Sequence, residues 1–232
     1  MPKHLHAILI AGVVAMLWVD ASHAQPAAPR TEPAVPQTAA QAPRDIDPTS
    51  GNRLPAPTSD GMGDADKKIF DAATRGRPAS VRFYSPKLAQ LLDDAQNYLK
   101  SETGFGDQLT EIAVLVTSRE MDSQFLWTVW EKHGRDPKDS RHIDPDIIDV
   151  IKYNKPVAGL REKDALFITF GRELFGQKKV SSETFDHAVR LLGRRGAVDL
   201  VELLSVWSAT CAELRAYDQQ LPAGQAPLLP AR

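Results

Sequence analysis

Between residues 62 and 220, apolar side chains recur mostly three or four positions apart, which is the spacing typical of amphipathic α-helices. Gly, Pro, Ser and Asp residues interrupt this pattern at the points where helices begin or end. The pattern therefore predicts an all-α fold, a helical bundle of about seven helices. The expected helices cover residues 64–74, 86–99, 107–133, 145–151, 162–175, 185–192 and 196–217.

Local signals support several of these boundaries. Ser85 and Asp144 each precede a proline, which combines a capping side chain with proline at the first helical position. Ser181 is expected to cap the helix that Gly193 ends. The segment Val81–Tyr84 could form a strand, but we find no second run to pair with it.

The expected helix at 107–133 is apolar on nearly every side, which is typical of a helix buried in a bundle or at a subunit interface. Polar residues inside such a helix are the informative ones. An ion pair or a solvated stripe would explain each of them without any function. They are Glu111, Thr117, Ser118, Arg119, Glu120, Asp122 and Gln124.

Residues 1–24 have the pattern of a signal peptide. Lys3 and the amino terminus precede a short apolar run, and Ser22-His23-Ala24 supplies small residues at an expected cleavage site. We therefore expect an exported protein, periplasmic or secreted, with no membrane segment after cleavage. An uncleaved anchor is the alternative.

Two segments flank the expected domain at 62–220. Residues 25–61 are rich in Pro and Ala and are predicted to form a disordered linker. Residues 221–232 contain three prolines and are predicted to be a flexible tail.

Composition excludes several classes of function. The chain has 28 Lys and Arg against 30 Asp and Glu, so its net charge of -2 provides no basic surface for nucleic acid. One cysteine excludes an intramolecular disulfide, a CxxC pair and a Cys-rich zinc site. That residue, Cys211, lies on an apolar stripe and is expected to be a buried, inert thiol, with an intermolecular disulfide as the alternative. No metal-binding spacing of histidines occurs, and we expect no metal and no cofactor.

Several short stretches occur in the order and spacing of a known family. They are Ser85-Pro86-Lys87-Leu88-Ala89, the run from Glu111 to Arg119, Gln124-Phe125-Leu126-Trp127, Ile147 to Lys152, Glu173-Leu174, Val180-Ser181 and Gly196 to Val201. Over about residues 53–218, the chain resembles the carboxymuconolactone decarboxylase family, which shares its helical fold with alkyl hydroperoxidase D. The resemblance implies that fold, and it implies a homo-oligomer that buries apolar helix faces between subunits.

The chain departs from the family at the usual active-site positions. Members commonly have Tyr-Glu-Trp-x-x-His in the core helix, and here Leu126 and Trp130 replace the Glu and the His. Neither side chain can accept a proton at neutral pH. The peroxidase branch has cysteines there, and those positions hold Gln124 and Trp127. Peroxiredoxin-like chemistry would therefore need an exposed and reactive Cys211.

The remaining candidates for catalysis are Glu111, Arg119 and His133. Decarboxylation of a lactone acid needs a cation to hold the carboxylate and a proton donor. Arg119 could supply the first and Glu111 the second, with His133 as a replacement for the missing histidine. The alternative is that Glu111 and Arg119 form surface or intersubunit ion pairs, and that His133 is a solvated residue at a helix end.

These residues define competing hypotheses. The first is an exported lyase acting on a small carboxylated or lactone molecule, with Trp127, Trp130 and Gln124 contacting the substrate. Core or interface packing is the alternative role for the tryptophans. The second hypothesis is a non-catalytic protein on the same fold that binds a small molecule or serves in assembly.

Overall fold

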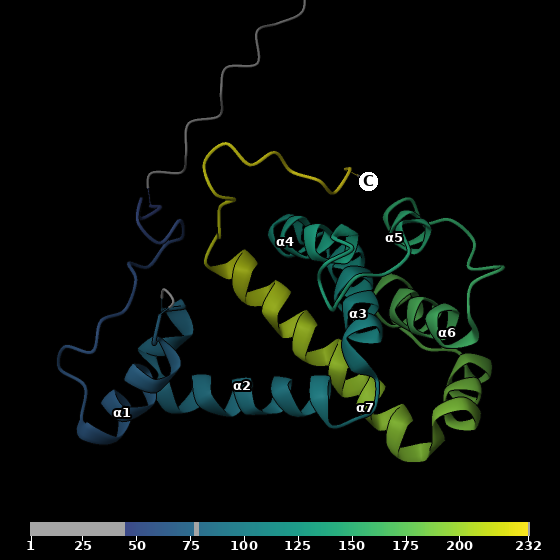
Figure 1. Ribbon diagram of the computed structural model, residues 1–232, viewed down its shortest axis with the longest axis horizontal. Coiled ribbons are helices and arrows are strands. Elements are labelled where there is room, and N and C mark those ends of the chain that lie inside the picture. Colours follow the sequence, from purple (N-terminus) through teal and green to yellow (C-terminus); the bar gives the residue numbers. More distant parts are fainter. Residues whose placement is uncertain (1–44, 77–78, 232) are drawn as a thin grey trace, which may run out of the picture. The chain divides into compact units, whose positions relative to one another are not determined.

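The computed structural model describes residues 45–76 and 79–231, and all regular secondary structure in that part of the chain is helical (Figure 1). This confirms the all-α prediction. The predicted signal peptide and residues 25–44 of the predicted linker lie outside the described residues. The helices are α1 (Asp64–Ala73), α2 (Pro86–Ser101), α3 (Gly106–Glu120), α4 (Gln124–Arg135), α5 (Pro145–Lys152), α6 (Glu162–Gly171) and α7 (Ser182–Ala216), with a 3-10 helix η1 (Val81–Tyr84) and a π-helix η2 (Arg172–Gly176).

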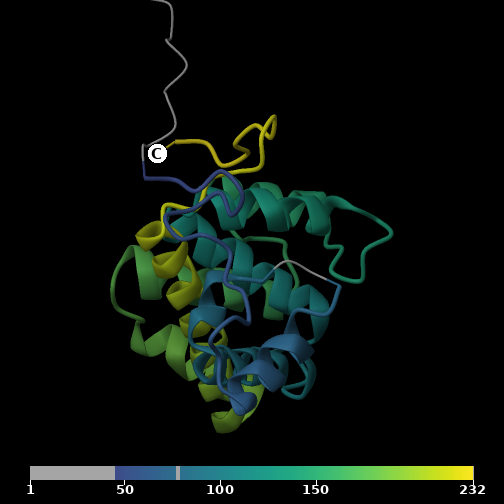
Figure 2. The ribbon, with the colours of Figure 1, turned by 90° about the vertical axis from the view of Figure 1, so that its left-hand side faces the viewer.

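Helix α3 occupies the centre of the bundle. It packs against α2, α4, α5, α6 and α7, and every residue from Leu109 to Arg119 is buried (Figures 1 and 2). A helix surrounded on all sides must be apolar on all sides, so the sequence pattern of this segment is explained.

The expected helix at 107–133 is two helices. α3 ends at Glu120 and α4 begins at Gln124, and Asp122 between them has a φ of 50°. Asp is one of the few residues that adopts this left-handed conformation readily. Neither glycine nor proline marks the break, so the helical period continues through it and the sequence pattern conceals it.

The chain also breaks at Gly193, as expected, where φ is 74° and ψ is 170°. The two predicted helices on either side of this residue form the two parts of α7. The possible strand Val81–Tyr84 is the 3-10 helix η1 instead, and its Phe83 is buried in a small cluster with Phe70 and Ala89. A single short segment gains its backbone hydrogen bonds locally when no partner strand is present.

Both flanking segments contact the helical body where the structure describes them. The Arg53 amide donates to the Tyr217 carbonyl over 3.0 Å, and the Gln220 amide donates to the Gly51 carbonyl over 2.8 Å. Beyond α7 the C-terminal segment crosses α4, and Leu229 is only 8% exposed (Figure 1). Residues 45–61 of the expected linker and the expected tail are therefore held by partners that lie far away in the sequence. Within residues 45–76 and 79–231, no helix combines the length and apolarity that crossing a membrane requires.

Candidate functional site

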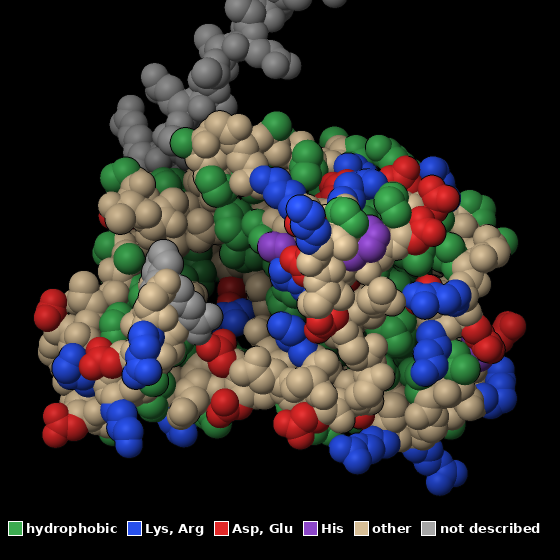
Figure 3. Space-filling model, viewed as in Figure 1, with side chains coloured by type: hydrophobic (Ala, Val, Ile, Leu, Met, Phe, Trp, Pro, Cys, Tyr) green, Lys and Arg blue, Asp and Glu red, His purple; other side chains and the backbone are tan. Residues whose placement is uncertain are grey.

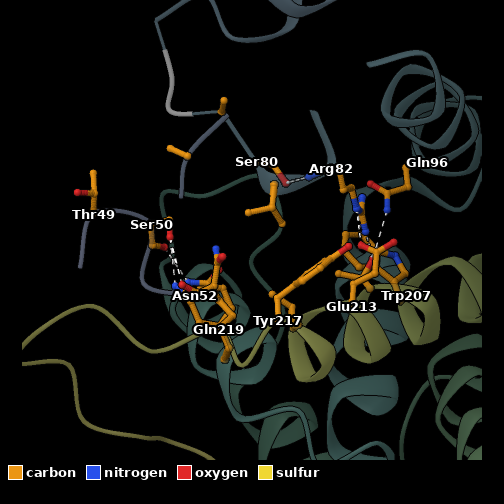
Figure 4. A pocket seen from close by; sticks show the side chains of 16 residues that line it. Thr49, Ser50, Asn52, Ser80, Arg82, Gln96, Trp207, Glu213, Tyr217 and Gln219 are labelled. Carbon is orange, nitrogen blue, oxygen red and sulfur yellow. Dashed lines mark hydrogen bonds and ion pairs between the residues drawn. The ribbon is translucent and has the colours of Figure 1, made fainter. Parts of the chain in front are cut away.

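A cavity of about 660 Å³ lies between the N-terminal segment, η1, α2 and the last turns of α7. The surface is hollowed in this part of the molecule (Figure 3), and the lining side chains are drawn in Figure 4. This volume is within the range of about 300–1,000 Å³ that is typical of small-molecule sites. The walls are largely aromatic or aliphatic and include Phe125, Trp207, Leu214 and Tyr217.

One end of the cavity contains a charged pair (Figure 4). Arg82 donates from Nε to Glu213 Oε2 over 2.5 Å and from Nη2 to Thr210 Oγ1 over 2.9 Å. Gln96 lies beside them, with its Nε2 3.5 Å from the same Thr210 oxygen. A guanidinium has five N–H donors and a carboxylate accepts several hydrogen bonds. The pair can therefore form further hydrogen bonds to a ligand, although its two charges cancel.

The other end is amidic and is built by the N-terminal segment. Asn52 donates from Nδ2 to Gln219 Oε1 over 3.0 Å, and Gln219 donates from Nε2 to the Ser50 carbonyl over 3.2 Å. Tyr217 lies between the two polar ends (Figure 4). The apolar pattern does not predict this site, because its residues come from a predicted linker, a short 3-10 helix and the end of the last helix. Their only sequence signal is a group of polar residues near the end of α7.

Trp130 lies behind the wall of this cavity, in contact with Trp207. Its ring meets that of Trp207 edge to face, with centroids 4.8 Å apart, and Trp130 is 9% exposed. The Arg141 guanidinium carbon lies 5.3 Å from the Trp130 ring centroid. Trp130 thus contacts both an aromatic ring and a cation.

Glu111 is the most unusual ionisable group in the described part of the chain. It is fully buried, and neither of its carboxylate oxygens has a hydrogen-bond partner. Burial raises the pKa of Glu111 to about 8, although the charge of Arg141 opposes this and the charges of Asp139 and Asp107 add to it. The backbone of Gly134 faces the carboxylate and lowers the pKa slightly. A methyl group at Gly134 would lie 3.2 Å from Glu111 Oε1, so the glycine leaves room for this carboxylate.

His133 belongs to a polar cluster at the end of α4. Its Nδ1 lies 3.0 Å from Asp139 Oδ2 and 2.7 Å from Arg141 Nη2. Hydrogen bonds from Arg141 hold the pKa of Asp139 far below its ordinary value. The structure thus brings Glu111, Trp130 and His133 into one region, and it adds Asp139 and Arg141. These two come from the irregular segment after α4, whose path the helical pattern does not predict.

The other predicted site residues lie elsewhere. Arg119 lies near the C-terminal end of α3, about two turns beyond Glu111. It is 3.7 Å from Asp122 and 3.5 Å from the Pro230 carbonyl. Trp127 donates from its indole N–H to buried Glu131 over 2.6 Å, and so belongs to an internal ion-pair network. Gln124 binds the C-terminal segment. Sequence spacing placed Arg119 and Glu111 on one helix but could not show that different elements cover their two ends.

Neither thiol nor metal chemistry has support in the described residues. Cys211 is 1% exposed, and burial raises the pKa of its thiol to about 11, so the reactive thiolate is scarce near neutral pH. Within the part of the chain that the structure describes, His, Cys, Asp and Glu form no group of three that could hold a metal ion.

Two solved structures share the fold of this chain. One is a protein of unknown function from Agrobacterium tumefaciens, assigned as an antioxidant defence protein AhpD, with a TM-score of 0.52 and 11% identity over 61% of this chain and 95% of that one. The other is a Cys→Ala variant of the debrominase Bmp8 in complex with 2,3,4-tribromopyrrole, with a TM-score of 0.57 and 13% identity over 75% of this chain and 94% of that one. No family model and no curated protein matches the chain. The chain therefore has the alkyl hydroperoxidase D-like fold, as the sequence resemblance implied, and at these identities the likeness extends to the fold alone.

Proposed function

We propose that this protein binds a small uncharged molecule in the cavity beneath its N-terminal segment. The observation that supports this most directly is the construction of the cavity, with apolar and aromatic walls between two polar ends. Small-molecule sites typically combine such walls with a few polar groups that orient the ligand. The loss of the family's Glu and His at Leu126 and Trp130 also favours binding over catalysis.

The polar ends indicate the class of ligand. Arg82 and Glu213 neutralise one another, so an uncharged ligand with a donor and an acceptor can use both without separating them. The amides of Asn52 and Gln219 at the far end favour a second hydrogen-bonding group. Phe125 and Tyr217 favour a flat ring between the two ends. The ligand class is therefore a neutral aromatic or lactone-like molecule with polar groups.

Calorimetric titration of the full chain with 4-hydroxybenzamide and 2-naphthol tests this proposal. For molecules of this size we expect a Kd on the order of 0.1–1 mM, or about 4–5.5 kcal/mol. The charged analogue 4-hydroxybenzoate should bind about fivefold more weakly. The cost of removing its carboxylate from water is not offset, because the arginine in the cavity is already neutralised.

A pair of variants on α7 separates cavity binding from surface adsorption. Leu214→Trp fills the cavity and should weaken binding about tenfold. Val198→Trp adds the same side chain on a surface position that is 58% exposed, and should leave binding unchanged. Equal affinities in the two variants, with both melting as the parent does, would exclude the cavity as the site.

A lyase is the second candidate, and the unpartnered carboxylate of Glu111 favours it. Because its pKa is raised to about 8, Glu111 holds a proton at neutral pH and could donate it. Arg141, rather than Arg119, is then the cation near it. Incubation with 4-carboxymuconolactone, followed by ultraviolet absorbance and carbon dioxide release, tests this activity. Glu111→Gln should lower turnover about 100-fold or more if the carboxyl group is the proton donor.

A further inference from the structure

The C-terminal segment lies across α4 after leaving α7, with a turn at residues 223–224 and a bend at Leu229 (Figures 1 and 2). Its residues Leu228, Leu229 and Pro230 contact the helical body, and Leu229 joins the main hydrophobic core. Proline favours extended backbone both at its own position and at the residue before it. Pro227 and Pro230 therefore reduce the number of backbone conformations that the segment can adopt when it is not bound.

Gln124 recognises the backbone of this segment with both ends of its amide. In the orientation that satisfies all its partners, its nitrogen donates to the Leu229 carbonyl over 2.9 Å. Its oxygen accepts from the Leu229 amide over 2.9 Å and from the Leu228 amide over 2.8 Å. The side-chain amide of Gln124 thus pairs with both the N–H and the C=O of Leu229, and its oxygen also holds the N–H of the preceding residue.

Two further side chains complete this surface. Thr128, one helical turn beyond Gln124, is buried and accepts from the Leu228 amide over 3.1 Å. The Arg119 Nη1 lies 3.5 Å from the Pro230 carbonyl. We call Arg119, Gln124 and Thr128 the tail-binding surface. The polar groups of this surface contact the peptide backbone of the tail. Because Leu229 lies in the core, an apolar side chain is also required at that position.

We propose that the tail-binding surface is a recognition site for a Leu-Leu-Pro segment that bends at its second leucine, and that the chain's own C-terminal segment occupies it as an internal ligand. Removal of the segment would leave the polar groups of Gln124 and Thr128 without these partners, which disfavours an empty surface. Attachment to α7 gives the segment an effective concentration in the millimolar range, so even a modest intrinsic affinity keeps it bound. This proposal does not depend on the cavity or its ligand.

Amide hydrogen exchange in the full chain tests whether the surface holds the tail. The Leu228 and Leu229 amides should be protected, and Gln124→Ala should raise their exchange rates at least tenfold. Gln177→Ala removes an exposed glutamine on another element and should have no effect. Exchange of both amides at the rate of an unstructured peptide in the parent chain would overturn the proposal.

A synthetic peptide tests recognition directly. Leu229→Asp in the full chain should release the tail, because the acidic side chain cannot enter the core. A peptide with the sequence of residues 224–231 should then bind with a Kd below about 1 mM. The same peptide with an N-methyl group at the Leu229 position loses the N–H that Gln124 accepts, and should bind at least tenfold more weakly. Equal binding of the two peptides would overturn the proposal, because the Leu229 N–H would then not be recognised. A dimer of the parent chain that depends on the tail would also overturn it, because a second copy would then supply the segment.

Discussion

At the scale of single residues, the two buried glutamates of the core have opposite surroundings. Glu131 accepts hydrogen bonds from Trp127, Arg135 and Lys152, and its charge is compensated. Glu111 is as deeply buried and has no hydrogen-bond partner for either oxygen. A native protein rarely retains such a group without a use for it, since an unpartnered buried polar group costs about 1–3 kcal/mol.

The raised pKa of Glu111 predicts how stability depends on pH. The folded chain holds this proton up to about pH 8, whereas the unfolded chain releases it near the ordinary value of 4.5. The free energy of unfolding should therefore fall as pH rises through this window, by roughly 5 kcal/mol in all. Glu111→Gln removes the titration and should flatten the curve, which makes the variant more stable than the parent at pH 8.

Urea unfolding at intervals between pH 4.5 and 8.5 measures this difference. Glu202→Gln, at an exposed position of α7, serves as the control and should follow the parent curve. An unchanged slope in Glu111→Gln would mean that the carboxyl group is charged in the folded chain throughout this range.

At the scale of elements, two breaks of the helical backbone arise from different causes. The break between α3 and α4 depends on Asp122 in a left-handed conformation, which an aspartate tolerates. The break in α7 depends on Gly193, whose φ of 74° and ψ of 170° lie in a region that is essentially restricted to glycine. The direction of the long C-terminal part of α7, and with it one wall of the cavity, therefore depends on one residue.

Gly193→Ala should lower the free energy of unfolding by about 1–3 kcal/mol. A methyl group there would meet no atom within 4 Å, so the cost comes from the backbone and not from a clash. Gly63, the N-cap of α1, also has open space around it but an ordinary φ of -67°, and Gly63→Ala should cost only the loss of a better capping residue, about 0.5–1 kcal/mol. Thermal melting of both variants compares the two. Equal effects would argue against backbone strain at Gly193.

At the scale of the whole molecule, α2 presents an apolar face that nothing in the described chain covers fully. Leu88 is 54% exposed and Leu91 is 53% exposed, and Tyr84 just before the helix is 52% exposed. Adjacent exposed apolar side chains often mark an interface between proteins. This supports our proposal that the protein is a homo-oligomer, which the family resemblance first suggested.

Sedimentation equilibrium should therefore give a mass above that of a single chain. Combining Leu88→Asp with Leu91→Asp should shift the protein toward the monomer, because two charges cannot be buried in an apolar interface. The paired substitution Lys87→Asp with Gln90→Asp changes the same helix outside these leucines and should preserve the assembly. A parent chain that sediments as a monomer would contradict the proposal.

Export stays a prediction that depends on residues 1–24. Sequencing of the amino terminus of protein recovered from a periplasmic or secreted fraction should give Gln25 as the first residue if cleavage follows Ala24.

The period of apolar residues was sufficient to predict the fold class, most of the helical segments and the buried character of α3, but not the break between α3 and α4. Each of these features depends on residues three or four positions apart, so short stretches of the sequence are enough to predict it. The motifs that resemble carboxymuconolactone decarboxylases extended the prediction to the alkyl hydroperoxidase D-like fold.

Tertiary structure alone placed the side chains that form the sites. Arg82 meets Glu213, Asn52 meets Gln219, and Gln124 meets Leu229, and each pair is separated by about a hundred residues or more. Such pairs form only after the helices have packed, because no periodicity links their positions. For the same reason, the proline content that predicts a linker at 25–61 and a tail at 221–232 gives no sign of the contacts that residues 45–61 and 221–231 make across the bundle.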